Sequence, residues 1–110
     1  MAYNEDVADA VRQALAELDV NAVERKMFGG LAFMVAGHMT VGVIGDELMV
    51  RVGKDGHEQA VGQPHAREMD FTGKAMTGMV YVAEAGFRGE GQLRAWIRRG
   101  LDNTATLPPK

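Results

Sequence analysis

The sequence contains no cysteine and no serine. Without cysteine there is no disulfide and no thiolate ligand for a metal, which fits the reducing cytoplasm, where we expect this protein. A hydroxyl nucleophile would have to come from threonine or tyrosine, and no threonine lies in a nucleophile-elbow motif. These absences argue against hydrolases of the serine or cysteine type, and we predict that the protein is not an enzyme.

Long apolar runs are also missing, because no stretch approaches the ~18 residues that a membrane-spanning helix needs. The first ten residues, MAYNEDVADA, are acidic, so we expect no secretory signal. The net charge is −3, whereas affinity for nucleic acid comes mostly from cations that neutralise phosphates. We therefore expect neither a membrane nor nucleic acid as a direct partner.

The histidines do not form a recognisable metal site. His57 and Glu58 begin like the zinc-protease helix motif, but Val61 stands where the second histidine belongs. The spacing from His57 to His65 matches no closed zinc site either. We predict no metal and no cofactor.

The N-terminal segment predicts a helix from Asn4 to Leu18. Asn4 is a good N-cap, and the two acidic residues after it lie where the helix dipole favours negative charge. Val7, Val11 and Leu15 recur at helical spacing and form one apolar stripe. This helix is expected to pack on one side only.

The rest of the chain alternates between strand and helix patterns. Period-two patterns and turn signals predict a three-stranded antiparallel meander over residues 31–35, 39–44 and 48–52, then a helix over 55–61, strands over 67–71 and 79–83, and a last helix over 90–103. The order α-β-β-β-α-β-β-α predicts an α+β fold, a two-layer sandwich with an antiparallel five-stranded sheet. We expect one domain, residues 1–110, with a proline-containing tail from about residue 105.

One face of this sheet is expected to be too apolar for open water. The chain has eight methionines, which fill gaps in cores and also form adaptable contact surfaces. The residues predicted to form an interface on that face are Met34, Met39, Val41, Val43 and Met49. An uncovered apolar face indicates self-association or a partner protein, and we expect a homodimer.

A small-molecule or enzymatic pocket is the alternative hypothesis. Its charged and polar residues would come from Arg25, Arg51 and the segment from His57 to Asp70.

The glycine pair Gly29-Gly30 lies between apolar residues and matches neither the P-loop nor the dinucleotide-binding spacing. The strand pattern that follows leaves no helix N-terminus to hold a phosphate. We predict a bend or bulge here, where the missing Cβ permits a positive φ or a close approach by a helix.

The block ERKMFGGLAFMVAGHMTVGVIGDELMVRVG, then MDFTGKAMTGMVYV, then a tryptophan-containing helix followed by LPPK, resembles the N-terminal domain of the TfoX/Sxy family. Its most specific motif is carried by Arg25, Lys26, Met27, Phe28, Gly29 and Gly30. The resemblance implies a two-layer α+β fold like that of type III secretion chaperones, with no established catalytic residues and no cofactor.

In the bacterial competence regulators of this family, a second, helical domain follows, and the whole protein acts as a transcriptional coactivator. The 110 residues contain no counterpart of that domain, so we expect a stand-alone domain and do not carry the competence role over. The prediction is a cytoplasmic, non-enzymatic protein-interaction module, an accessory regulator of transcription or of competence-type processes.

Overall fold

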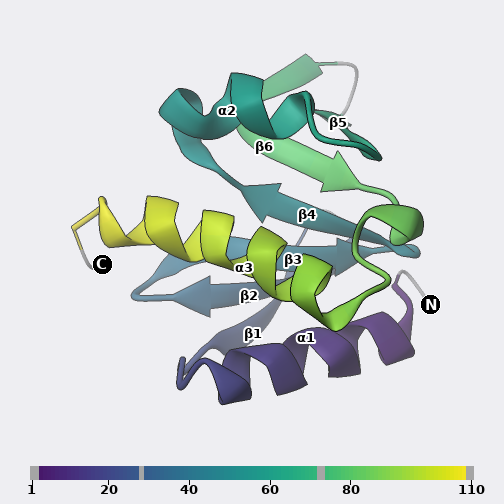
Figure 1. The fold of residues 1–110 in the computed structure, drawn as a ribbon. Helices are drawn as coiled ribbons and strands as arrows, with labels where there is room; N and C mark the ends of the chain where they lie inside the picture. Colours follow the sequence, from purple (N-terminus) through teal and green to yellow (C-terminus); the bar gives the residue numbers. More distant parts are fainter. Residues whose placement is uncertain (1–2, 28, 72–73, 109–110) are drawn as a thin grey trace.

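The computed structural model describes residues 3–27, 29–71 and 74–108. Its elements are α1 (Glu5–Glu17), β1 (Val23–Met27), β2 (Gly30–Val35), β3 (His38–Ile44), β4 (Glu47–Arg51), α2 (Gly53–Val61), β5 (Ala66–Phe71), β6 (Lys74–Val82), the 3-10 helix η1 (Glu84–Gly86) and α3 (Glu90–Ala105). The helices lie on one side of a single sheet, with α3 running across its middle (Figure 1). The predicted α+β class is confirmed.

The sheet has six strands in the order β1-β2-β3-β4-β6-β5, and every neighbouring pair is antiparallel. The sequence predicts five strands, and the additional one is β1. Its residues Val23–Met27 carry three consecutive charged side chains and are exposed along most of their length. A strand at the edge with both faces open needs no alternation of apolar and polar residues, so periodicity gives no signal for it.

Helix α1 forms as predicted. The Asn4 side-chain oxygen accepts hydrogen bonds from the backbone N–H groups of Asp6 (2.8 Å) and Val7 (3.3 Å), which satisfies two donors that have no partner within the helix. Val7, Val11 and Leu15 are buried. Each of these side chains contributes about 1.5–3 kcal/mol by leaving water.

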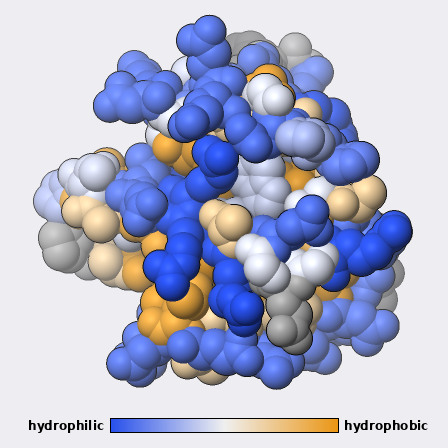
Figure 2. Space-filling model, viewed as in Figure 1, coloured by the Kyte–Doolittle hydropathy of each residue, from blue (hydrophilic) through white to orange (hydrophobic). Residues whose placement is uncertain are grey.

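The main core lies between the helices and the sheet. It combines Leu31, Phe33, Val41, Val43, Leu48, Val50, Val80 and Val82 of the strands with Val11 and Leu15 of α1 and Leu93, Trp96 and Ile97 of α3. The outer surface on the helix side is mainly hydrophilic (Figure 2).

The Gly29-Gly30 pair connects β1 to β2, and Met27 pairs with Gly30 across this connection. Gly29 has φ +76°, so the predicted positive φ is confirmed. A Cβ on Gly30 would overlap the carbonyl oxygen of Val43, so the close approach comes from a neighbouring strand and not from a helix. The register shift in β2 lies between Phe33 and Met34, so the predicted bulge is not at the glycine pair.

The C-terminal tail begins where α3 ends, at Ala105, as expected. The Nε2 atom of the buried His38 lies 2.7 Å from the carbonyl oxygen of Pro108 and donates a hydrogen bond to it. This bond fastens the tail to the start of β3.

Candidate interaction surface

An irregularity in β3 decides which residues face the helices and which face away. Phe33 pairs with Val41 and Met34 pairs with Met39, so Thr40 is an extra residue without a partner of its own on β2. The Thr40 hydroxyl contacts α3 through Thr104. Two successive side chains of β3, Thr40 and Val41, therefore point to the helix side, as in a β-bulge.

The bulge corrects the predicted interface. Val41 and Val43 are fully buried in the main core beneath the helices, so they are not available on the uncovered face. Met34, Met39 and Met49 do lie on that face. Met39 and Met49 are buried there and Met34 is half-buried, so Met34 alone of the five offers surface to a partner.

The uncovered face carries a second, smaller core, which we call the methionine layer. It consists of the buried residues Ala32, Met39, Met49, Met69 and Met79, with Met27, Met34, Ile44 and Tyr81 packed around them and half-buried. None of the helices in the described part of the chain packs on this layer, since α1, α2 and α3 lie on the opposite side (Figure 1). The centre of the layer is buried, so the apolar surface that this face offers comes from the half-buried Met27, Met34, Ile44 and Tyr81 around it.

Three arginines surround the methionine layer. Strand pairing places Arg25 opposite Ala32, Arg51 opposite Met79 and Arg67 opposite Tyr81, which puts all three on the uncovered face.

Arg67 is neutralised by an ion pair with Glu47, which raises the pKa of the Arg67 guanidinium. Its guanidinium carbon also lies 4.7 Å from the centre of the Tyr81 ring, within the range of a cation–π contact. For Arg25 and Arg51 the structure records no ion pair within the described residues. The face thus combines half-buried apolar side chains with two positive charges that have no carboxylate partner among the described residues.

The alternative pocket predicted from Arg25, Arg51 and residues 57–70 is not assembled. Arg25 is on β1 and Asp70 is on β5, which are opposite edges of the sheet. His57 lies on α2, on the helix side. Its Nδ1 accepts a hydrogen bond from the Gly78 N–H (2.9 Å), and its Nε2 lies 3.2 Å from the Glu68 carboxylate. These bonds attach α2 to strands β6 and β5, so His57 has a structural role.

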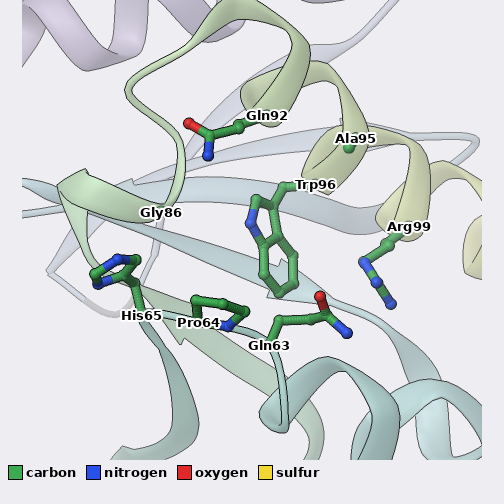
Figure 3. Close-up of a pocket in the computed structure, with 8 residues that line it drawn as sticks. All are labelled: Gln63, Pro64, His65, Gly86, Gln92, Ala95, Trp96 and Arg99. Carbon is green, nitrogen blue, oxygen red and sulfur yellow. The ribbon is translucent and has the colours of Figure 1, made fainter.

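Two cavities along α3 were not anticipated from the sequence. One cavity of about 190 Å³ is lined by Gln63, Pro64, His65, Gly86, Gln92, Ala95, Trp96 and Arg99 (Figure 3), and a second of about 480 Å³ is lined by Val52, Lys54, Asp55, Gly56, Arg99, Asp102, Asn103 and Thr106. Arg99 lines both, and its guanidinium carbon lies 5.1 Å from the centre of the Trp96 ring. The sequence places Trp96 on the apolar face of its helix. Residues 63–65 and Gly86 form the other wall of the cavity beside it, and the sequence gives no sign of their position.

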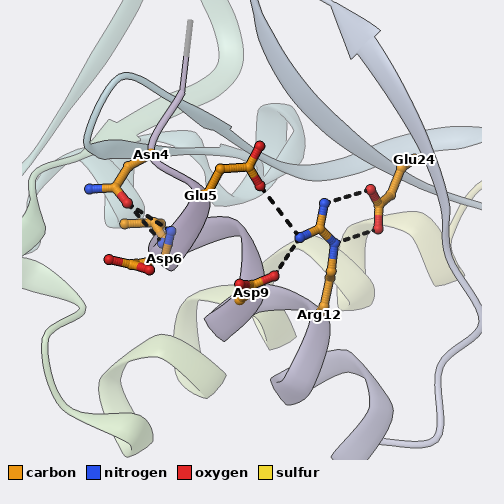
Figure 4. A network of polar contacts seen from close by, with 7 residues as sticks. Asn4, Glu5, Asp6, Asp9, Arg12 and Glu24 are labelled. Carbon is orange, nitrogen blue, oxygen red and sulfur yellow. Dashed lines mark hydrogen bonds and ion pairs between the residues drawn. The ribbon is translucent and has the colours of Figure 1, made fainter. Parts of the chain in front are cut away.

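A polar network joins α1 to the edge strand β1. The Arg12 guanidinium donates two hydrogen bonds to the Glu24 carboxylate, at 2.7 and 2.8 Å, and a third to Asp9 at 2.6 Å (Figure 4). Because a carboxylate that accepts charged hydrogen bonds is stabilised in its ionised form, the pKa of Glu24 lies below its ordinary value. Nothing in this network resembles an acid–base pair, since both partners are held in their charged forms.

The sequence motif with the highest specificity maps onto the β1–β2 hairpin. Arg25, Lys26 and Met27 form the end of β1, Gly29 lies in the connection, and Gly30 begins β2. Phe28 lies outside the described residues. The protein-family model named TfoX N-terminal domain matches residues 6–104 of the sequence. This range includes all helices and strands described above except the first residue of α1 and the last residue of α3. The chain belongs to the TfoX N-terminal domain family. A search of curated proteins found no match.

Two further observations apply to this TfoX N-terminal domain. In the part of the chain that the structure describes, no helix is both long and apolar enough to cross a membrane. Within the same residues, no three histidine, aspartate or glutamate side chains gather into a group that could hold a metal ion.

Proposed function

We propose that this TfoX N-terminal domain is a non-enzymatic interaction module that docks a partner protein on the uncovered face of its sheet. The observation that supports this proposal is the combination of half-buried apolar side chains around the methionine layer with Arg25 and Arg51, which lack carboxylate partners in the described residues. Apolar contact area supplies affinity, and the two guanidinium groups supply direction and specificity.

The chemistry of the face defines the class of partner. Methionine side chains adapt to different apolar shapes, as they do at other promiscuous binding surfaces. Guanidinium groups bind carboxylates through paired hydrogen bonds. The partner segment should therefore carry apolar side chains flanked by aspartate or glutamate. In keeping with the family resemblance, we place this docking in the cytoplasm, in an accessory role in the regulation of transcription or of competence-type processes.

The test uses charge reversal on the two faces of the domain. Arg25→Glu and Arg51→Glu change the uncovered face, whereas the matched control Arg98→Glu changes an exposed arginine on α3. The tagged domain is used to capture proteins from native lysate, and the captured partner is then purified and titrated directly. Binding should fall at least about tenfold in the first two variants and stay unchanged in the control. Equal binding by all variants, or no saturable binding, would refute the proposal.

The two cavities along α3 support a second candidate function, the binding of a small anionic ligand. Arg99 supplies a positive charge at the junction of the two cavities, and Trp96 supplies an aromatic surface beside it. A thermal-shift screen with carboxylates, nucleotides and sugar phosphates tests this function. A ligand at about 100 times its Kd should stabilise the protein by about 2.7 kcal/mol, and the shift should disappear in Arg99→Ala. An absence of shifts across the library would exclude this candidate.

A further inference from the structure

The two edges of the sheet differ in how well they could accept another strand. At one edge, β5 has an irregular register between Glu68 and Asp70, and bulges of this kind protect edges from pairing. At the other edge, β1 pairs with β2 in five consecutive positions without any shift. Regular, extended backbone is the geometry that a further antiparallel strand requires.

Strand β1 is also open to solvent. Val23 is 70% exposed and is the most exposed large apolar side chain among the described residues. Glu24 and Lys26 point to the helix side, yet both are exposed, so α1 does not lie over β1. Arg12 reaches Glu24 from α1 through side chains alone. Within the described residues, the backbone of β1 makes no hydrogen bond to backbone groups outside the sheet.

The sequence of β1, Val-Glu-Arg-Lys-Met, is complementary to itself when it is read in the opposite direction. We propose that β1 pairs antiparallel with β1 of a second copy of the chain, about a two-fold axis that passes through Arg25. The two six-stranded sheets then form one continuous sheet with all helices on the same side.

This register places complementary side chains opposite each other. Glu24 of each copy lies opposite Lys26 of the other on the helix side, which gives two pairs of opposite charge. Val23 of each copy lies opposite Met27 of the other on the uncovered side, so the exposed valine is covered and the two methionine layers are joined.

Other registers of the pairing between the two β1 strands place less favourable side chains opposite each other. A shift of one residue would place helix-side residues opposite uncovered-side residues, which the pleat forbids. A shift of two would bring Glu24 opposite Glu24, or Lys26 opposite Lys26, and would lose both ion pairs. The proposed register has one unfavourable contact, between the two Arg25 side chains at the axis.

The expected affinity is modest. A pair of five-residue strands buries less surface than the roughly 1,200 Å² of a standard stable interface. The dimer should therefore form and dissociate with concentration, with a Kd at or above the micromolar range. The pairing does not rest on the proposed docking function, although both involve Arg25, which lies on β1 at the two-fold axis. Arg51 lies on β4, away from this edge, so Arg51→Glu tests docking without changing the strand pair.

Sedimentation velocity on the purified chain, from about 1 μM to about 1 mM, tests the pairing. The wild type should pass from monomer to dimer in this range. Lys26→Glu places four carboxylates at the axis and should weaken the dimer at least about tenfold, as should Glu24→Lys, which gathers four lysines there. Arg98→Glu, on α3, is the matched control and should dimerise like the wild type.

A mixing experiment separates strand pairing from a loss of folding. The Glu24→Lys and Lys26→Glu variants should each be monomeric alone and should form a heterodimer when mixed, because all four facing charges are then opposite. The double variant Glu24→Lys/Lys26→Glu should recover the homodimer, and Arg25→Gln should tighten it by removing the one like-charge contact. Circular dichroism verifies that each variant is folded.

The proposal is overturned if the wild type stays monomeric up to ~1 mM. It is equally overturned if a dimer forms but neither single charge reversal weakens it, or if the mixture of the two reversals does not associate.

Discussion

The side-chain oxygens of Thr40 and Thr104 lie 2.6 Å apart in the core and join the bulge of β3 to the last turn of α3. Both residues are buried. Thr40 also donates to the carbonyl oxygen of His38 at 3.3 Å, so Thr104 is the donor in the bond between the two hydroxyl groups. This pair therefore fixes α3 against the strand whose irregularity separates the two apolar faces of the sheet.

Replacing one partner of this pair should cost more than replacing both. Thr104→Val leaves a buried hydroxyl acceptor without a donor, which should lower the free energy of unfolding by about 1–3 kcal/mol. Thr40→Val should have a similar effect. In the double variant no hydroxyl is left without its partner. The decrease in the free energy of unfolding should therefore be smaller than the sum of the decreases in the two single variants. Urea unfolding of the four proteins measures this coupling, and strict additivity would contradict it.

Gly30 should not tolerate any side chain. The overlap of a Cβ with the Val43 carbonyl oxygen would push β2 away from β3, so Gly30→Val should reduce stability by about 3 kcal/mol or more. Gly91, in the first turn of α3, has nothing within 4 Å of its missing Cβ. Gly91→Ala is therefore the matched control and should be neutral or stabilising by up to about 1 kcal/mol. A Gly30→Val protein that melts like the wild type would refute this account.

The methionine layer should behave as a true core at its centre. Met49 is fully buried, and Met49→Ala should lower the free energy of unfolding by about 2–5 kcal/mol through lost contacts and the cavity it leaves. Met34 is half-buried on the same face, and Met34→Ala should cost less than about 1 kcal/mol. Denaturant unfolding of both variants checks the difference. Equal losses would mean that Met34 is as enclosed as Met49.

The Arg12–Glu24 pair should stabilise the folded protein only at pH values at which the Glu24 carboxylate is ionised. Because Arg12 lowers the pKa of Glu24 from its ordinary value of 4.5, the folded protein is stabilised at pH values above 4.5, and this contribution is lost as the pH falls through the lowered pKa. The Glu24 side chain is 39% exposed, so we expect about 0.2–1 kcal/mol at neutral pH. Glu24→Gln should be less stable than the wild type by this amount at pH 7, and the two proteins should converge as the pH falls from 4.5 through the lowered pKa of Glu24. A difference in stability that does not shrink as the pH falls below 4.5 would contradict the assignment.

Much of the fold could be predicted because strong local signals coincide with tertiary structure. Asn4 caps a helix whose apolar stripe is buried, and the turns at Gly37 and Gly45 separate strands with clear alternation. Strand β1 lacked such a signal, since its side chains face solvent on both sides and its place is set by pairing with β2.

The interface prediction failed where the period of two is broken. In an unbroken strand Met39, Val41 and Val43 would share one face, but the extra residue Thr40 moves Met39 to the opposite face from the two valines. The bulge depends on the partner strand and on the contact of Thr40 with Thr104, which are 64 positions apart in the sequence. The two cavities at Arg99 likewise arise where the start of α2, residues 63–65 and Gly86 pack beside α3, and they have no local signature.

The graded burial of the methionines has a consequence for chemical oxidation. Peroxide converts an accessible thioether to a polar sulfoxide, while enclosed sulfur atoms react slowly. Met27 and Met34, which are half-buried, should therefore oxidise before Met49 and Met69, which have no exposed surface. Mass spectrometry of briefly treated protein would then report, residue by residue, which parts of the uncovered face become protected when another molecule binds there.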